Sequence, residues 1–167
     1  FLRTKGYVAN VGIYGQSFGG YLSLHAVVAA PDVFTAAADL YGITNRFDYF
    51  ERSDRVGRVF VMRDYGGRGP QDAPDDYLRA STHHRLGEIR TPMLILHGSE
   101  DTRVPPVQSE AVVEQLRALG IEHEYVVYPG EGHGFRKREH RIDAYGRLAA
   151  WFHRHLAPEQ TTDSDEG

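Results

Sequence analysis

A glycine-rich turn near the start of the chain constrains the fold most strongly. Residues 15–20 (GQSFGG) follow a short apolar run and precede a helix-like stretch at 21–30. A serine at the tip of so tight a turn lies close to backbone on both sides, so its neighbours must lack side chains. Gly15 and Gly19 meet that requirement, and Gly20 lets the helix pack close to the strand. The stretch therefore predicts a strand, a strained turn at Ser17 and a helix.

Ser17 on such a turn has the features of a nucleophile. Its hydroxyl is presented at a helix N-terminus, where the backbone N–H of Phe18 can stabilise negative charge on a bound oxygen. A purely structural turn is the alternative interpretation. A phosphate-binding loop matches less well, because the run lacks the Gly-Lys-Ser/Thr ending and the dinucleotide spacing. The rest of the chain must therefore supply a base and an acid.

Strand-like and helix-like segments alternate along most of the chain. Apolar runs typical of buried parallel strands occur at residues 8–14, 34–41, 92–97 and 122–128. Apolar residues at helical spacing occur at 21–30, 106–119 and 139–156. Between 42 and 90 we expect a long irregular region with one short helix at 74–80. This alternation predicts an α/β fold, with a partial doubly wound parallel sheet of about four strands and flanking helices.

Composition and charge exclude several classes of protein. The net charge is −4, but four acidic residues lie in the last nine positions, which leaves a neutral body without the basic face that nucleic-acid binding needs. No apolar run approaches the roughly 18 residues of a membrane span. The chain has no cysteine, which excludes disulfides and thiolate metal sites and is compatible with a cytoplasmic location. We expect no metal or cofactor, because the adjacent pair His83-His84 lacks the spacing of a metal motif.

Three residues in a fixed order can provide catalysis. A serine needs an imidazole to accept its proton, and the imidazole needs a carboxylate to orient it. Asp101 follows the apolar run at 92–97 and lies 84 residues after Ser17, and His133 follows the last run, 32 residues further on. Open parallel sheets place their sites at such carboxyl ends of strands. The order predicts Ser17 as nucleophile, Asp101 as orienting acid and His133 as general base.

Alternatives remain for the acid and the base. Taken singly, Asp101 also suits a helix cap and His133 a surface turn. Glu100 is a second candidate for the acid. His97 ends a buried apolar run, so we expect it to order the turn that follows rather than to act as base.

The segments GQSFGGY, HGSEDTRVPP and YPGEGHGF together resemble the catalytic domain of the prolyl oligopeptidase family of serine peptidases. That family includes acylaminoacyl peptidases and dipeptidyl peptidases. The resemblance covers residues 1–156 and implies an α/β-hydrolase fold, whose nucleophile elbow is the Gly-x-Ser-x-Gly turn. It implies the three catalytic roles given above, Phe18 N–H as an oxyanion donor and a peptide or acyl substrate. Phe47 and Tyr49 fall where related enzymes build part of an apolar pocket, with a small satellite core as the alternative.

The resemblance also implies partners outside this chain. Several strands precede the elbow in a complete α/β hydrolase, so we expect residues 1–156 to be the C-terminal part of the domain, followed by a disordered acidic tail at 157–167. The missing parts would be the N-terminal half, which carries a second oxyanion donor on a tyrosine, and a β-propeller. Three functional hypotheses follow: a serine peptidase, a carboxylesterase or acyl hydrolase on the same fold, and a silent fragment that needs its upstream half.

Overall fold

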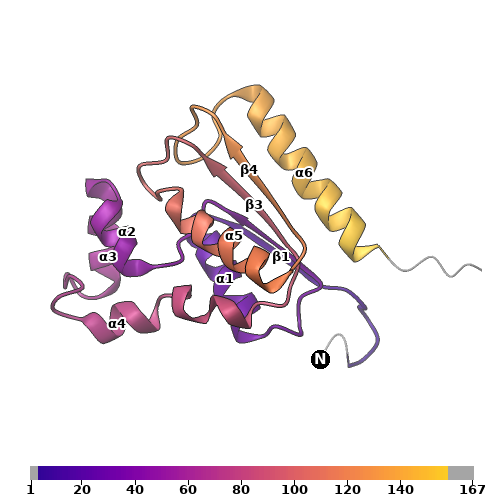
Figure 1. The fold of residues 1–167 in the computed structure, drawn as a ribbon, viewed down its shortest axis with the longest axis horizontal. Coiled ribbons are helices and arrows are strands. Elements are labelled where there is room, and N and C mark those ends of the chain that lie inside the picture. The colour runs from indigo at the N-terminus through magenta and orange to yellow at the C-terminus, as the bar shows by residue number, and fades with distance from the viewer. Residues whose placement is uncertain (1–3, 158–167) are drawn as a thin grey trace, which may run out of the picture.

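A four-stranded parallel sheet forms the centre of the molecule (Figure 1). In the computed structural model, residues 4–157 are described. Of the tail predicted at 157–167, only residue 157 lies within this range. The strands lie side by side in the order of the sequence and all pair in parallel: β1 (Gly12–Gln16), β2 (Ala36–Leu40), β3 (Met93–Gly98) and β4 (His123–Tyr128). The predicted partial doubly wound sheet is confirmed, although β1 begins four residues later than expected.

Helices cover both faces of this sheet. α1 (Phe18–Ala29) and α5 (Val107–Leu119) pack on one face, and α6 (Arg138–Leu156) packs on the other. Successive side chains of a strand point to opposite faces. Accordingly, Ile95 of β3 packs with the α1 and α5 side chains, whereas Leu94 packs with Trp151 of α6. Since both faces are covered, β3 is buried throughout, as its apolar sequence predicted.

The region between residues 42 and 90 is more helical than the sequence pattern suggested. It contains α2 (Arg46–Arg52), α3 (Arg55–Asp64), α4 (Pro74–Arg79) and the 3-10 helix η1 (His83–Glu88), so the expectation of a largely irregular segment was wrong. The helix predicted at 74–80 is present as α4. Side-chain caps begin the two unexpected helices: Asn45 accepts from the N–H groups of Phe47 and Asp48, and Asp54 accepts from Gly57 N–H.

A second, smaller core holds these helices together on the side of the molecule away from α6 (Figure 1). The buried ring of Tyr77 lies at its centre, with the ring centroids of Tyr65 and Phe47 at 4.3 Å and 5.6 Å. Tyr21 of α1 and Val104, which follows β3, also belong to this core and join it to the rest of the domain. The helical region forms a layer over the carboxyl end of the sheet.

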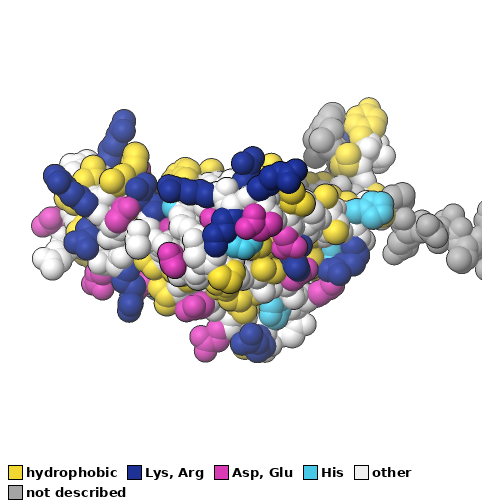
Figure 2. All heavy atoms as spheres, turned by 90° about the horizontal axis from the view of Figure 1, so that it is seen from above, with side chains coloured by type: hydrophobic (Ala, Val, Ile, Leu, Met, Phe, Trp, Pro, Cys, Tyr) yellow, Lys and Arg dark blue, Asp and Glu magenta, His cyan; other side chains and the backbone are white. Residues whose placement is uncertain are grey.

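The surface carries charges of both signs. On the face drawn in Figure 2, basic and acidic side chains are interspersed with apolar ones. None of the helices described between residues 4 and 157 has the length and apolar character needed to cross a membrane.

Candidate active site

The backbone at Ser17 is strained, as the sequence predicted. Its φ of 54° and ψ of −116° lie in a region that non-glycine residues seldom adopt. Hydrogen bonds on both sides hold it there: Ser17 N–H donates to Leu40 O at 2.9 Å, and Ser17 O accepts from Tyr21 N–H at 3.0 Å. The first bond extends the β1–β2 ladder and the second begins α1, so the strand and the helix jointly fix the serine.

The glycines around the turn have unequal roles. A Cβ atom on Gly15 would lie 2.1 Å from the carbonyl carbon of Gly19, so position 15 cannot carry a side chain. A Cβ atom on Gly20 would lie 2.2 Å from Asp39 Oδ1 and 2.9 Å from Gly42 Cα, which confirms the predicted close packing. A Cβ atom on Gly19 would meet nothing within 4 Å. The steric argument therefore holds for Gly15 and Gly20 and was wrong for Gly19.

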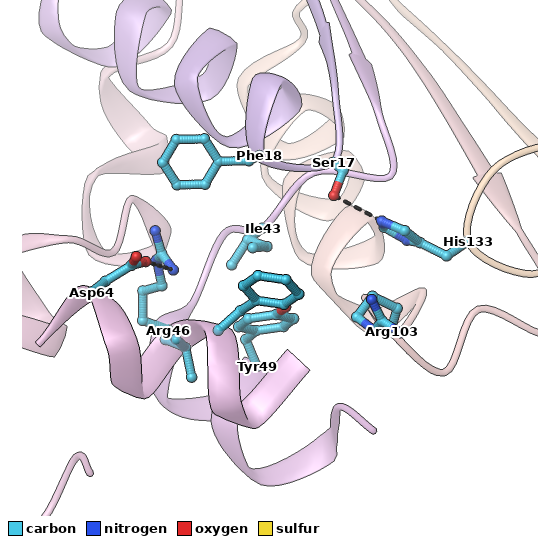
Figure 3. Close-up of a pocket in the computed structure, with 10 residues that line it drawn as sticks. Ser17, Phe18, Ile43, Arg46, Tyr49, Asp64, Arg103 and His133 are labelled. Atoms are coloured by element: carbon cyan, nitrogen blue, oxygen red, sulfur yellow. Dashed lines mark hydrogen bonds and ion pairs between the residues drawn. The ribbon is translucent and has the colours of Figure 1, made fainter. Parts of the chain in front are cut away.

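Ser17, His133 and Asp101 form one continuous chain of hydrogen bonds. Ser17 Oγ lies 2.7 Å from His133 Nε2, and His133 Nδ1 lies 2.8 Å from Asp101 Oδ2 (Figure 3 draws the first of these). The carboxylate can only accept, so Nδ1 carries the proton and Nε2 is free to accept from the serine hydroxyl. Glu100, the alternative acid, has an exposed side chain, and the contact with His133 is made by Asp101.

The Asp101 carboxylate is buried and held in place on both oxygens. Oδ1 accepts from the N–H groups of Arg103 and Val104, each at 2.9 Å, while Oδ2 faces His133. Burial alone would raise the pKa of Asp101, but interactions with His133, His97 and the Val104 N–H outweigh it and lower the pKa to about 2. The group is therefore an anion throughout the neutral range.

His97 orders the turn that carries Asp101, as predicted. The imidazole is fully buried, with Nε2 at 2.8 Å from Val104 O and Nδ1 at 2.7 Å from Ser109 Oγ. A carbonyl can only accept, so Nε2 carries the proton and Nδ1 accepts from the Ser109 hydroxyl. Nε2 lies 3.6 Å from Asp101 Oδ2, beyond hydrogen-bond distance.

Glu131 fixes the loop that carries His133, and the sequence reasoning missed it. Its buried carboxylate accepts from Arg136 N–H at 2.8 Å, from Lys137 N–H at 2.9 Å and from His140 Nδ1 at 2.8 Å. Burial raises the pKa of Glu131, but these three donors outweigh that effect and hold the pKa below its usual value. The signal in the sequence was an acidic residue inside the turn YPGEGHGF.

Tyr41 is the second residue near His133 that the sequence reasoning missed. Its ring centroid lies 5.0 Å from that of His133, and its hydroxyl donates to Gln16 Oε1 at 2.6 Å. Burial raises the pKa of Tyr41 to about 12, so the hydroxyl remains a donor. With Ser17, it is one of the two non-glycine residues at positive φ in the part of the chain that the structure describes. Nothing in the sequence signals that strain.

A mainly apolar cavity of about 260 Å³ opens beside Ser17 (Figure 3). Tyr49 lines it, as expected for a pocket residue, whereas Phe47 is not among its lining residues and packs in the smaller core. Ser17, Phe18, Arg103 and His133 line it from the carboxyl end of the sheet. The remaining lining side chains come from the helical region: Ile43, Arg46, Tyr49, Phe60, Val61 and Asp64. The volume is below that of a site for a drug-sized ligand, and it suits a single side chain.

Two charged pairs border this cavity. Arg46 Nη1 lies 3.1 Å from Asp64 Oδ2, and Arg103 Nε lies 2.8 Å from Asp54 Oδ1. An arginine at the start of a short helix ordinarily points into solvent, so no feature of the sequence singled out Arg46. In residues 4–157, His, Asp and Glu side chains form no group of three that could hold a metal ion.

Comparison with known proteins identifies the family. The sequence profile of the prolyl oligopeptidase family matches residues 1–159. The chain belongs to the prolyl oligopeptidase family. It is 27% identical to acylamino-acid-releasing enzyme 1 of Oryza sativa subsp. japonica, over 94% of this chain and 21% of the relative. It is 32% identical to dipeptidyl aminopeptidase BIII of Pseudoxanthomonas mexicana, over 77% of this chain and 19% of the relative.

Solved structures of the family share this fold. The acylaminoacyl peptidase of Pyrococcus horikoshii superposes with a TM-score of 0.82 at 26% identity, over 99% of this chain and 27% of the other. The chain thus spans about a fifth to a quarter of the length of these members of the prolyl oligopeptidase family.

Proposed function

We propose that this chain carries the catalytic triad of a serine peptidase, with Ser17 as nucleophile, His133 as general base and Asp101 as the carboxylate that orients it. The observation that carries the proposal is the hydrogen-bond chain from Ser17 Oγ through His133 to Asp101 Oδ2. The strained backbone at Ser17 and the adjoining apolar cavity support it, because both are features of a built nucleophile site.

In the acylation step, Ser17 Oγ attacks the carbonyl carbon of the peptide bond while its proton passes to His133 Nε2. The negative charge that develops on the carbonyl oxygen is stabilised by the N–H of Phe18. This group begins α1 and so has no partner inside the helix. The C–N bond then breaks, and His133 gives the proton to the departing amine. The ionised Asp101 stabilises the imidazolium that forms in between.

Deacylation repeats these steps with water in place of the serine. His133 Nε2 takes a proton from water as the water oxygen attacks the acyl carbon, and the proton returns to Ser17 Oγ as the ester bond breaks. The products are an amine and a carboxylic acid. No metal or cofactor takes part in this scheme.

We also infer that further segments complete the site in the working protein. The chain spans about a fifth of its curated relatives, and β1 is an edge strand. Tyr14 of β1 and Leu22 of α1 are exposed. An edge of this kind is suited to pairing with more strands. Those upstream strands would bring the second oxyanion donor, and a β-propeller would restrict access to the site.

A cytoplasmic location remains our expectation, because the chain has no cysteine.

Active-site labelling tests the assignment. We expect a fluorophosphonate to label Ser17, mapped by mass spectrometry, in the longest natural polypeptide that contains this chain. Labelling is expected to be abolished by Ser17→Ala and His133→Ala, whereas His153→Ala, on the exposed face of α6, retains it. The rate is expected to fall as the pH is lowered, because a protonated imidazole cannot accept the serine proton. A rate that does not change between pH 5 and 8 would contradict His133 as the base.

Two comparisons separate the alternatives. Turnover of peptide anilides alongside short acyl esters supports the peptidase, and turnover of esters alone assigns a carboxylesterase or acyl hydrolase instead. Labelling of the 167-residue chain by itself at the rate of the longer polypeptide would refute the silent-fragment hypothesis. A rate lower by orders of magnitude would support the need for upstream strands.

A further inference from the structure

We propose that the cavity beside Ser17 selects an aromatic side chain that ends in a neutral oxygen acceptor. Tyrosine is then preferred over phenylalanine at the substrate residue whose carbonyl is attacked. Arg46 determines this preference. The inference rests on the proposed function, because it concerns the acyl-donor side of the same site. It adds a substrate class and a residue that the triad itself does not specify.

The first observation is that Arg46 is buried with most of its donors unused. Only 4% of its side chain is exposed, and among residues 4–157 its guanidinium makes one hydrogen bond, from Nη1 to Asp64. Its Nε is buried and has no hydrogen-bond partner in the described part of the chain. Leaving a buried donor unpaired is costly, particularly on a charged group. A guanidinium that lines a cavity in this state is suited to an incoming oxygen.

The second observation is the position of Arg46 within the cavity. Figure 3 shows its guanidinium on the opposite side of the cavity from Ser17, with Ile43 between them and the Phe18 ring beside the guanidinium. A side chain that extends from a carbonyl held at Ser17 therefore meets Arg46 with its far end. Only a group at that far end can use the unpaired donors.

Arg46 is also held rigidly. Its backbone N–H donates to Ser81 Oγ at 2.9 Å, and its Cζ lies 4.3 Å from the centre of the Tyr21 ring, within the range of a cation–π contact. The guanidinium therefore does not have to be ordered when a ligand binds, which lowers the entropic cost of recognition.

The walls of the cavity favour a flat apolar body. Phe18, Tyr49 and Phe60 contribute three rings, and Ile43 and Val61 contribute aliphatic surface. Aromatic side chains pack well against one another in offset or edge-to-face arrangements. A phenyl ring fits this lining, and a longer polar chain does not.

The charge balance favours a neutral end group. Arg46 is paired with Asp64, and Arg103, which also lines the cavity, is paired with Asp54. Each pair is neutral, so a carboxylate would bring an uncompensated negative charge beside Asp64. A phenol avoids that repulsion: its oxygen accepts from Arg46.

The experiment compares matched substrates on the longest natural polypeptide that contains this chain. We expect kcat/KM for an acyl-tyrosine anilide to exceed that for the phenylalanine analogue by about tenfold or more, the effect of one hydrogen bond to a charged group. In Arg46→Met the ratio is expected to fall to about one. Because both substrates are measured on the same variant, a uniform loss of activity does not change the ratio.

Two further variants sharpen the test. Arg52→Met removes another arginine of α2 that is paired with an aspartate but lies outside the cavity lining, and it is expected to keep the wild-type ratio. In Asp64→Asn the charge of Arg46 is no longer balanced, so turnover of a glutamate substrate is expected to rise several-fold relative to phenylalanine. Asp64 itself is 45% exposed, but its partner Arg46 is only 4% exposed, so this variant leaves a buried positive charge without its carboxylate partner.

The outcomes distinguish the two proposals. A ratio near one in the wild type, or an unchanged ratio in Arg46→Met, overturns the role of Arg46 while Ser17-dependent turnover continues. An absence of Ser17-dependent turnover of any substrate overturns the proposed function instead. Thermal unfolding of Arg46→Met verifies that the variant is folded.

Discussion

Two regions meet at the cavity, and they are built differently. At the carboxyl end of the sheet, Ser17, Asp101 and His133 are each fixed by hydrogen bonds, and the supporting His97 and Glu131 are buried. The helical region at 42–90 supplies most of the cavity wall, yet it is held by a small core and leaves several apolar side chains exposed. Under the proposed function, the sheet positions the catalytic residues and the helical region determines the shape of the substrate that fits.

The sharpest test of the sheet side is Asp101→Asn. The amide would keep the contacts of Oδ1 but present an NH₂ group to His133 Nδ1, which forces the ring proton onto Nε2, where it blocks acceptance from Ser17. We expect kcat/KM to fall by about 10³–10⁴-fold with little change in substrate preference. Steady-state kinetics on two substrates measures both quantities, and a loss below tenfold would contradict the assigned role.

A second test concerns Asp39, a fully buried carboxylate of β2 whose oxygens have no hydrogen-bond partner in the described chain. Burial raises the pKa of Asp39 to about 6. The unfolded chain loses this proton near pH 4, so the folded state loses stability as the pH rises from about 4 to about 6, by roughly 3 kcal/mol. We expect Asp39→Ala to abolish this loss.

Chemical denaturation at pH 4 and pH 8 measures the effect. The free energy of unfolding of the wild type should fall relative to that of Asp39→Ala between these two values. A constant difference would show that Asp39 titrates normally despite its burial.

A smaller effect is expected for Glu131→Gln, which tests whether the His133 loop needs its buried anion. The amide retains one acceptor oxygen but turns its NH₂ group either toward the Arg136 N–H or toward the Lys137 N–H and His140 Nδ1. We expect a loss of about 1–2 kcal/mol of stability and about tenfold in kcat/KM. The matched change Glu139→Gln, on the exposed start of α6, should leave both unchanged. Equal effects from the two variants would argue against a specific role for Glu131.

The smallest effect is expected on the helical side. Phe60 lines the cavity from α3 and is 53% exposed, so Phe60→Ala should cost little stability. We expect KM for an aromatic substrate to rise about two- to fivefold, as one partly exposed contact is lost, while the rate of acylation by a small acetyl ester is unchanged. Val59→Ala, an exposed neighbour outside this cavity, is the control. A large fall in acylation by the small ester would break the division between the two regions.

Sequence reasoning succeeded where the backbone is regular and failed where contacts are irregular. The four strands could be predicted because buried parallel strands appear in the sequence as apolar runs. The order Ser17, Asp101, His133 could be interpreted because the carboxyl ends of parallel strands share one edge of the sheet. The helices α2 and α3 are short, and their main signals were the caps Asn45 and Asp54. Tyr41 and Arg46 could not be selected at all, because their roles depend on tertiary contacts with His133 and Tyr21.

The strand order has a consequence for biosynthesis. Each strand of the sheet pairs with the one made just before it, so the sheet can grow along a single edge as the polypeptide leaves the ribosome. Ser17 and its strained turn are then secured by β2, well before β4 has been translated. His133 is delivered only by the loop that follows β4, so under the proposed function the serine of the nascent chain stays inactive until β4 and this loop have been made.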